Sequence, residues 1–402
     1  MFPPLSHRLP HAPERNALTA RLDALRAAGV SIADLTESNP TQAGIPYPGD
    51  LLSPLAGAEG LRYAPLPLGL ESARQAVADD YARRGAHVDP RHVVLTASTS
   101  EAYTWLFKLF CNPGDRVLVP RPSYPLFEHL ARLEGIAIDT YDLDYHGHWD
   151  VDTAAIRNAR DDVRALIIVT PNNPTGSCIS APEFDVIASI CRDRGWALIA
   201  DEVFADYLLE ARDPATEPVR DFATRSSCLT VSLGGLSKSV GLPQLKLGWM
   251  VVGGPDGARD AVLSALEIIA DSFLSVSTPV QLALPQLLTR GAGVRDAIQS
   301  RIRTNLLILR DEATGFAECD VPLVEGGWSA VIRVPAIRSE ESLVLELLER
   351  ERILVFPGFF FDFRHEAYLV VSLLGDPDVF RAVVPRLLLA ATREPGTSLA
   401  AV

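Results

Sequence analysis

Three side chains with different chemistry follow three short apolar runs of the sequence. They are the amide of Asn173, the carboxylate of Asp201 and the amine of Lys238. The runs that precede them comprise residues 166–169, 196–200 and 229–233. Short, largely apolar runs are typical of parallel strands that are buried on both faces. Ligands bind beyond the carboxyl ends of such strands, so we expect the three side chains to converge on one crevice. Taken singly, they also fit a turn, a helix cap and a solvated cation.

Lysine is rare in this chain. Only three of its 37 basic residues are lysines, namely Lys108, Lys238 and Lys246. A guanidinium group cannot be deprotonated in a protein and does not form a Schiff base at ordinary pH. A lysine that is kept in such a chain indicates a position where an amine is needed, although chance is the alternative for any one of the three.

A candidate phosphate site lies at residues 95–101, between an apolar run and an apolar helical pattern. The spacing of Ser98 and Glu101 predicts a capping box, in which the Glu101 carboxylate bonds back to the N–H of Ser98. A helix start with free N–H groups and the hydroxyls of Ser98, Thr99 and Ser100 suits a phosphate. An ordinary helix cap is the alternative. The sequence holds neither a GxxxxGK[ST] nor a GxGxxG motif.

The order of the elements predicts an α/β fold. Short apolar runs alternate with helical patterns as far as Gly253, and a mostly helical stretch and a smaller α+β region follow. We expect a large domain with a mostly parallel central sheet sandwiched by helices at residues 46–290. A smaller α+β domain would combine residues 1–45 with residues 291–402.

Composition excludes several classes of function. The net charge of −14 argues against nucleic acid or an anionic membrane as a partner. No apolar stretch is long enough to span a membrane, and no recognised metal-binding motif occurs, so no metal site is expected. The five cysteines form no CxxC pair, and we interpret them as reduced thiols of a cytoplasmic protein.

From about residue 38 to residue 372 the chain resembles a class I/II aminotransferase of the fold-type I pyridoxal-phosphate (PLP) enzymes. The resemblance rests on the order of several weak motifs and on the 37-residue step from Asp201 to Lys238. The motifs are Tyr63, Thr96–Ala102, residues 112–115, residues 122–125, residues 173–176, Asp201-Glu202-Val203, Ser237-Lys238 and residues 241–248.

The resemblance implies roles for these residues toward PLP. Lys238 would form the internal aldimine and later carry the proton between two carbon atoms. Asp201 would bond the pyridine nitrogen and keep the ring an electron sink. Asn173 would bond the phenolic oxygen, and Tyr124 would stack on the ring. Hydroxyl groups and a cation would hold the phosphate: Ser98, Thr99, Ser100 and Lys246.

The resemblance also implies partners. Tyr63 would reach the phosphate in the neighbouring subunit, so we expect a homodimer with shared active sites. Asn39 would lie in an N-terminal loop that covers the substrate. The substrates would be an amino donor and an oxo-acid acceptor.

This sequence departs from the family pattern at several positions. Phe204 replaces a tyrosine that bonds the phenolic oxygen, and Gly235 replaces a phosphate-binding serine. Val370 stands where the family has an arginine that clamps the substrate carboxylate. Arg364 is the first candidate to replace that arginine, and Arg333 is the second.

We therefore predict a PLP-dependent aminotransferase that passes through a pyridoxamine form. Two alternatives remain open from the sequence. One is a PLP-dependent lyase, such as a C–S lyase, of the same fold, and the other is a non-catalytic protein that binds an effector.

Overall fold

A central sheet of eight strands organises the protein in the computed structural model, which describes residues 6–9, 16–211, 218–220, 222–225 and 227–394. The strand order is β2-β9-β8-β7-β6-β3-β4-β5. The strands are β2 (Val93–Thr96), β3 (Arg116–Arg121), β4 (Ala137–Tyr145), β5 (Trp149–Val151), β6 (Val163–Val169), β7 (Ala197–Asp201), β8 (Thr230–Gly235) and β9 (Gly248–Gly253). The five strands from β8 to β4 pair in parallel, and β2, β9 and β5 join antiparallel. The predicted α/β fold with a mostly parallel sheet is confirmed.

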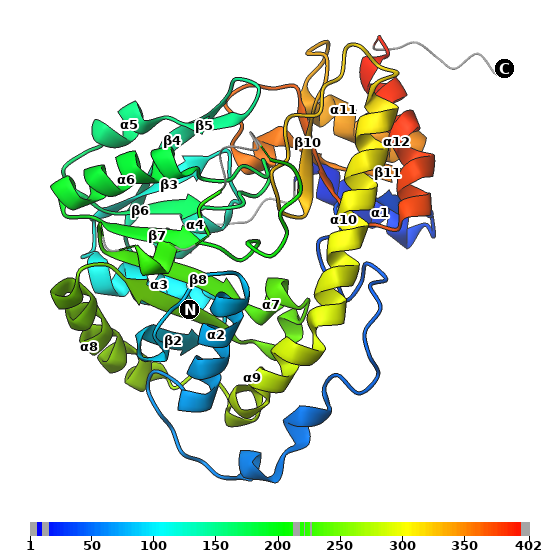
Figure 1. Ribbon diagram of the computed structural model, residues 1–402. Coiled ribbons are helices and arrows are strands. Elements are labelled where there is room, and N and C mark those ends of the chain that lie inside the picture. The colour runs from blue at the N-terminus through cyan, green and yellow to red at the C-terminus, as the bar shows by residue number, and fades with distance from the viewer. Residues whose placement is uncertain (1–5, 10–15, 212–217, 221, 226, 395–402) are drawn as a thin grey trace, which may run out of the picture.

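Helices cover both faces of this sheet because its strands are apolar on both sides (Figure 1). One face packs against α3 (Thr99–Phe110), α4 (Leu126–Glu134) and α8 (Asp256–Phe273). The other face packs against α5 (Thr153–Arg157) and α6 (Ala181–Arg194), and next to them against α2 (Glu71–Arg83) and α9 (Thr278–Arg290).

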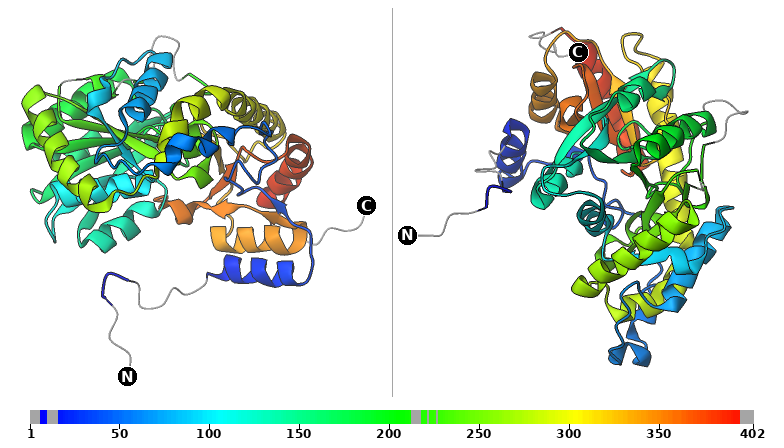
Figure 2. Two further views of the ribbon diagram at one scale, coloured as in Figure 1. Left: turned by 90° about the horizontal axis from the view of Figure 1, so that it is seen from below. Right: turned by 90° about the vertical axis from the view of Figure 1, so that its left-hand side faces the viewer.

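Two smaller sheets lie beside the large one. Strands β10 (Ser329–Arg333), β13 (Tyr368–Ser372) and β12 (Phe356–Pro357) form an antiparallel sheet in the order β10-β13-β12. Strand β1 (Ala33–Asp34) pairs in parallel with β11 (Ile353–Leu354). The helices near these sheets are α1 (Ala17–Ala27), α10 (Ala292–Ala313), α11 (Glu340–Glu346) and α12 (Pro377–Thr392). Figure 2 shows α1 alongside α11, so a segment near the N-terminus packs with the C-terminal third. The boundaries at residues 45 and 290 stay predictions.

Strands β4, β5 and β9 were not among the sequence predictions. Strand β4 carries polar residues at several positions because it lies near the edge of the sheet, so it lacks the continuous apolar run of a central strand. Strand β9 begins and ends with glycine. Within the described residues, no helix has both the length and the apolar composition needed to cross a membrane.

Candidate active site

The three predicted side chains do follow neighbouring strands. Val169 at the end of β6 pairs with Asp201 at the end of β7, and Asp201 pairs with Leu233 in β8. Lys238 lies on the single helical turn α7 (Leu236–Ser239), directly after β8. Because the three strands are parallel, their carboxyl ends open onto one edge of the sheet.

The amine of the partly buried Lys238 lies beside two aromatic rings that pack against each other, with ring centres 5.4 Å apart. Its Nζ atom lies 4.7 Å from the ring centre of Trp328 and 5.5 Å from that of Phe204. Burial lowers the pKa of Lys238 to about 8, and the nearby charge of Asp201 acts in the opposite direction. Lys238 is therefore an amine that loses its proton near neutral pH, as a nucleophilic lysine must.

The carboxylate of Asp201 is oriented by two hydrogen bonds. The Tyr103 hydroxyl donates to Oδ2 at 2.8 Å, and the backbone N–H of Val203 donates to Oδ1 at 3.2 Å. Burial raises the pKa of Asp201, while these two hydrogen bonds and the charge of Lys238 oppose the rise. A bound cationic group would favour the ionised form of this carboxyl.

The loops after β3 and β6 are joined by hydrogen bonds. Asn172 donates from Nδ2 to the carbonyl of Pro122 at 3.1 Å, which ties together the segments that carry Tyr124 and Asn173. The Asn173 Oδ1 atom accepts a hydrogen bond from the Ser329 hydroxyl of β10 at 3.3 Å. Tyr124 is half exposed. The stacking and bonding roles of Tyr124 and Asn173 stay predictions.

Helix α3 begins at the predicted phosphate site. Ser98 caps the helix by accepting from the N–H of Glu101 at 3.1 Å. The return bond differs from the prediction, since the Glu101 carboxylate accepts from the N–H of Ala97 at 2.6 Å and not from that of Ser98. The Glu101 carboxylate also accepts from the hydroxyl of Ser275. Ser98 is therefore the N-cap, as predicted, but the return bond reaches one residue further back than a capping box requires.

Glycines bring two backbone segments close to this helix start. A Cβ atom on Gly248 would lie 3.2 Å from the backbone carbon of Ser98. A Cβ atom on Gly235 would lie 3.2 Å from the Cα of Gly248. The serine that the family places at residue 235 would crowd this cradle, so glycine suits the close approach of the two strands.

Lys246 lies two residues before Gly248. It is exposed and adopts a left-handed backbone conformation with φ of 51°. In the part of the chain that the structure describes, its amine makes no hydrogen bond or ion pair. It is thus a cation near Gly248 in sequence that pairs with no carboxylate of the described residues.

Four predicted site residues make no described contact with Lys238 or Asp201. Three of them bond other side chains, and the fourth is exposed. The side-chain oxygen of Asn39 accepts from the Thr41 hydroxyl at 2.8 Å, and Tyr63 is largely exposed. Arg364 pairs with Asp142 at 3.0 Å. Arg333 pairs with Asp320 at 3.3 Å. No described contact joins any of these four side chains to Lys238 or Asp201, and their roles stay predictions.

Sequence reasoning missed several residues that surround Lys238 and Asp201. Tyr103 lies one turn after Thr99 on α3, so helical spacing could have indicated it. Trp328 directly follows a pair of glycines, and no pattern in the sequence relates it to Lys238. Its indole N–H is buried and makes no hydrogen bond among the described residues.

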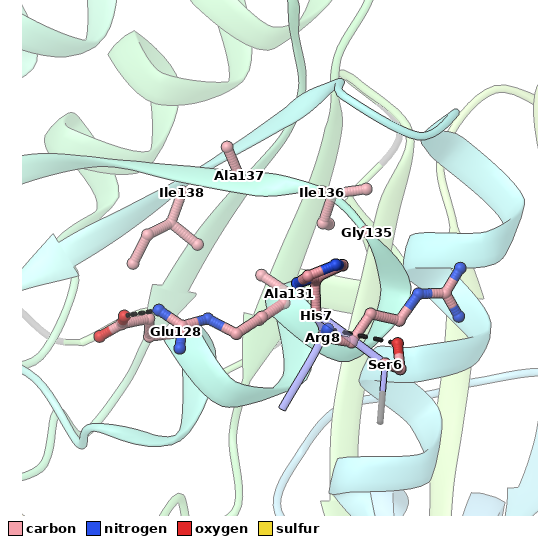
Figure 3. A pocket seen from close by; sticks show the side chains of 10 residues that line it. Ser6, His7, Arg8, Glu128, Ala131, Gly135, Ile136, Ala137 and Ile138 are labelled. Carbon is pink, nitrogen blue, oxygen red and sulfur yellow. Dashed lines mark hydrogen bonds and ion pairs between the residues drawn. The ribbon is translucent and has the colours of Figure 1, made fainter. Parts of the chain in front are cut away.

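A wide surface pocket is a separate feature. It has a volume of about 670 Å³ and lies between residues 6–8 and the region of α4 and β4 (Figure 3). None of the predicted site residues lines it. We therefore assign the chemistry to the strand ends and not to this cavity.

Asp201→Asn should shift the titration of the Lys238 amine to lower pH by roughly one unit, because the carboxylate that favours the ammonium form is lost. Acetylation of Lys238 in the cofactor-free protein, followed against pH by peptide mass spectrometry, measures this midpoint. The exposed Asp260→Asn serves as the control and should leave it unchanged. If the midpoint in Asp201→Asn equals or exceeds that of the wild type, Asp201 does not stabilise the ammonium form of Lys238.

Comparisons with known proteins agree with this geometry. The glutamate-pyruvate aminotransferase AlaA of Haemophilus influenzae is 29% identical over 375 residues, which cover 89% of this chain and 87% of that protein. The S-alkyl-thiohydroximate lyase SUR1 of Arabidopsis thaliana is 30% identical over 240 residues, which cover 59% of this chain and 51% of that protein. The alanine aminotransferase structure from Pyrococcus furiosus superposes with a TM-score of 0.83 at 22% identity and covers 92% of this chain and 95% of that one. The sequence profile of class I and II aminotransferases matches residues 55–387, and the chain belongs to this family.

Proposed function

We propose that this aminotransferase holds pyridoxal phosphate between α3, β7 and α7 and moves an amino group from an amino acid to a 2-oxo acid. The observation that carries the proposal is the buried amine of Lys238, in the field of Asp201 and with a pKa of about 8. The family assignment supports the same chemistry.

The residues at the strand ends fit the groups of this cofactor. A buried amine suits an aldehyde, and a buried carboxylate suits a protonated ring nitrogen. The start of α3 offers N–H groups and the hydroxyls of Ser98, Thr99 and Ser100 to a phosphate. Gly235 and Gly248 add no side chain of their own next to this helix start.

Bound pyridoxal phosphate would supply an aldehyde carbon and a ring that withdraws electrons. Lys238 would first bind the aldehyde carbon and, once released, take up and return a proton at Nζ. Asp201, held by Tyr103, would keep a positive charge on the ring nitrogen. The rings of Phe204 and Trp328 would exclude water from around Nζ.

The purified holoenzyme should be yellow, and borohydride should attach the cofactor to the peptide that contains Lys238. Adding amino acids one at a time should convert the bound cofactor to its amine form, and a 2-oxo acid should reverse the change. Lys238→Arg should lose the reaction because a guanidinium group cannot replace the amine. Attachment at Lys108 or Lys246, or no spectral change with any donor, would overturn the proposal.

A lyase is the second candidate, because one of the relatives bears the name S-alkyl-thiohydroximate lyase. The same donor screen separates the two functions. Release of ammonia and an oxo acid without an acceptor identifies a lyase. Dependence of turnover on an added 2-oxo acid identifies an aminotransferase.

Lys246 is proposed to bind the cofactor phosphate. Lys246→Ala should weaken PLP binding about ten- to a hundredfold, as expected when a charged hydrogen bond of roughly 1.5–3 kcal/mol is lost. The absorbance band of the cofactor should still form at saturating PLP. A fluorescence titration measures the affinity, and Lys108→Ala is the control, since Lys108 pairs with Glu134 on the surface. Equal affinity in wild type and Lys246→Ala would remove this lysine from the site.

Arg364 is proposed to bind the donor carboxylate, with Arg333 as its rival. Binding a substrate would require Arg364 to leave Asp142, with which it pairs at the surface. Arg364→Leu should raise the Michaelis constant for amino-acid donors about ten- to a hundredfold without changing PLP affinity. The matched variant is Arg333→Leu, and the larger effect identifies the partner. If neither variant alters amino-acid kinetics and simple amines are good donors, the carboxylate premise fails.

We infer that the enzyme is a homodimer. Support comes from Leu61, Tyr63 and Leu66, which are 92%, 77% and 51% exposed and lie within six residues of one another. Large apolar side chains that gather on a surface mark interfaces. Light scattering should give twice the chain mass of 43.6 kDa, and Leu61→Asp should weaken the association. A monomer mass for the wild-type enzyme would contradict the inference.

A further inference from the structure

The turn that carries Lys238 is too short to hold itself in place. Helix α7 has four residues, and an isolated turn of this length is unstable. Its last carbonyl groups need partners from elsewhere in the chain. The Tyr207 hydroxyl donates to the carbonyl of Lys238 at 2.6 Å and lies 3.3 Å from that of Ser239. Arg295 Nε donates to the carbonyl of Ser239 at 3.0 Å.

Arg295 is itself held by two buried carboxylates, those of Asp80 and Asp206. Its Nη2 atom lies 3.4 Å from Asp80 on α2, and its Nε atom lies 3.6 Å from Asp206. The side chains of Arg295, Asp80 and Asp206 are only 9%, 4% and 5% exposed. Arg83 pairs with both aspartates and closes the cluster. Because a buried charge without its partner is strongly unfavourable, this arrangement leaves Arg295 little freedom.

The two anchors come from the segment that also provides Asp201. Strand β7 ends at Asp201, and Asp206 and Tyr207 follow within six residues. The bond from Tyr207 and the ion pair of Asp206 therefore tie this segment to the turn of Lys238. Trp328, which contacts the Lys238 amine, also packs edge-on against the ring of Tyr207, with ring centres 5.1 Å apart.

We propose that Tyr207 and Arg295 are positioning residues, which fix the backbone of Lys238 relative to Asp201 and so keep its amine beside Phe204 and Trp328. Neither residue needs to touch a substrate to do so. The proposal rests on the proposed function in one respect, because it takes Lys238 as the reactive amine. It concerns the state of that amine before any cofactor or substrate binds.

Tyr207→Phe and Arg295→Lys test the proposal. The first removes one hydroxyl, and the second keeps the charge but loses the planar fork that joins a carbonyl to two carboxylates. If the turn is released, the amine leaves the rings, reaches water and titrates closer to its ordinary pKa. Acetylation of Lys238 in the cofactor-free protein should then have a midpoint about one pH unit higher, which makes labelling roughly fivefold slower at pH 8.

Arg338→Lys is the matched control, because Arg338 is equally buried and pairs with Glu346 on α11. It should lower the melting temperature without moving the Lys238 midpoint. Midpoints equal to that of the wild type in both test variants would overturn the proposal and leave the cluster a structural one. Should Arg295→Lys not fold, Tyr207→Phe decides alone. This readout needs no transamination, so a protein that fails every donor assay can still confirm or contradict the positioning role.

Discussion

A primary amine held in an apolar interior is the constraint on which the site depends. Water stabilises an ammonium ion far better than the rings of Phe204 and Trp328 do, so burial lowers the pKa of Lys238 to about 8. The carboxylate of Asp201 limits this effect. Asp201 must itself remain oriented although it is buried, and Tyr103 and the backbone provide the hydrogen bonds for that. The chemistry of the amine thus depends on groups that never react.

Helix α10 bonds both the turn that carries Lys238 and the segment that follows β13. Near its start, Arg295 bonds the carbonyl of Ser239 beside the lysine. Further along, Arg301 and Asn305 bond backbone carbonyls of residues 373–375, directly after β13. Ten residues of helix separate Arg295 from Asn305, which corresponds to about 15 Å. A single straight element, conspicuous in Figure 1, therefore sets the distance between the lysine turn and the smaller sheet.

The sequence predicted those strands and helices whose residues form a recognisable pattern within a short stretch of the chain. The central strands appear as largely apolar runs, and the motifs that follow them placed Asn173, Asp201 and Lys238 after neighbouring strands. Tyr103 and Arg295 were missed because their partners lie 98 and 56 residues away along the chain. A contact of that kind depends on how helices pack on the sheet and leaves no local pattern. The return bond of Glu101 was misplaced by one residue, since its carboxylate accepts from the N–H of Ala97, and the spacing of the motif alone does not distinguish that N–H from its neighbour.

The apolar cluster around β13 bears on how a donor carboxylate could be held. Ser329 of β10 bonds Asn173, so the face of the sheet that carries Ser329 is turned toward the strand ends. Strand residues two apart share a face, which places Val331 and its partner Val370 on the same side as Ser329. Both valines are only 1% and 2% exposed and pack against Phe361, so they form part of the protein's own core. A charged side chain at position 370 would lose its water in this cluster without gaining a hydrogen bond. The position that carries the carboxylate-binding arginine in the family pattern is therefore closed to a cation in this chain, and a cation that holds a donor carboxylate must come from another element.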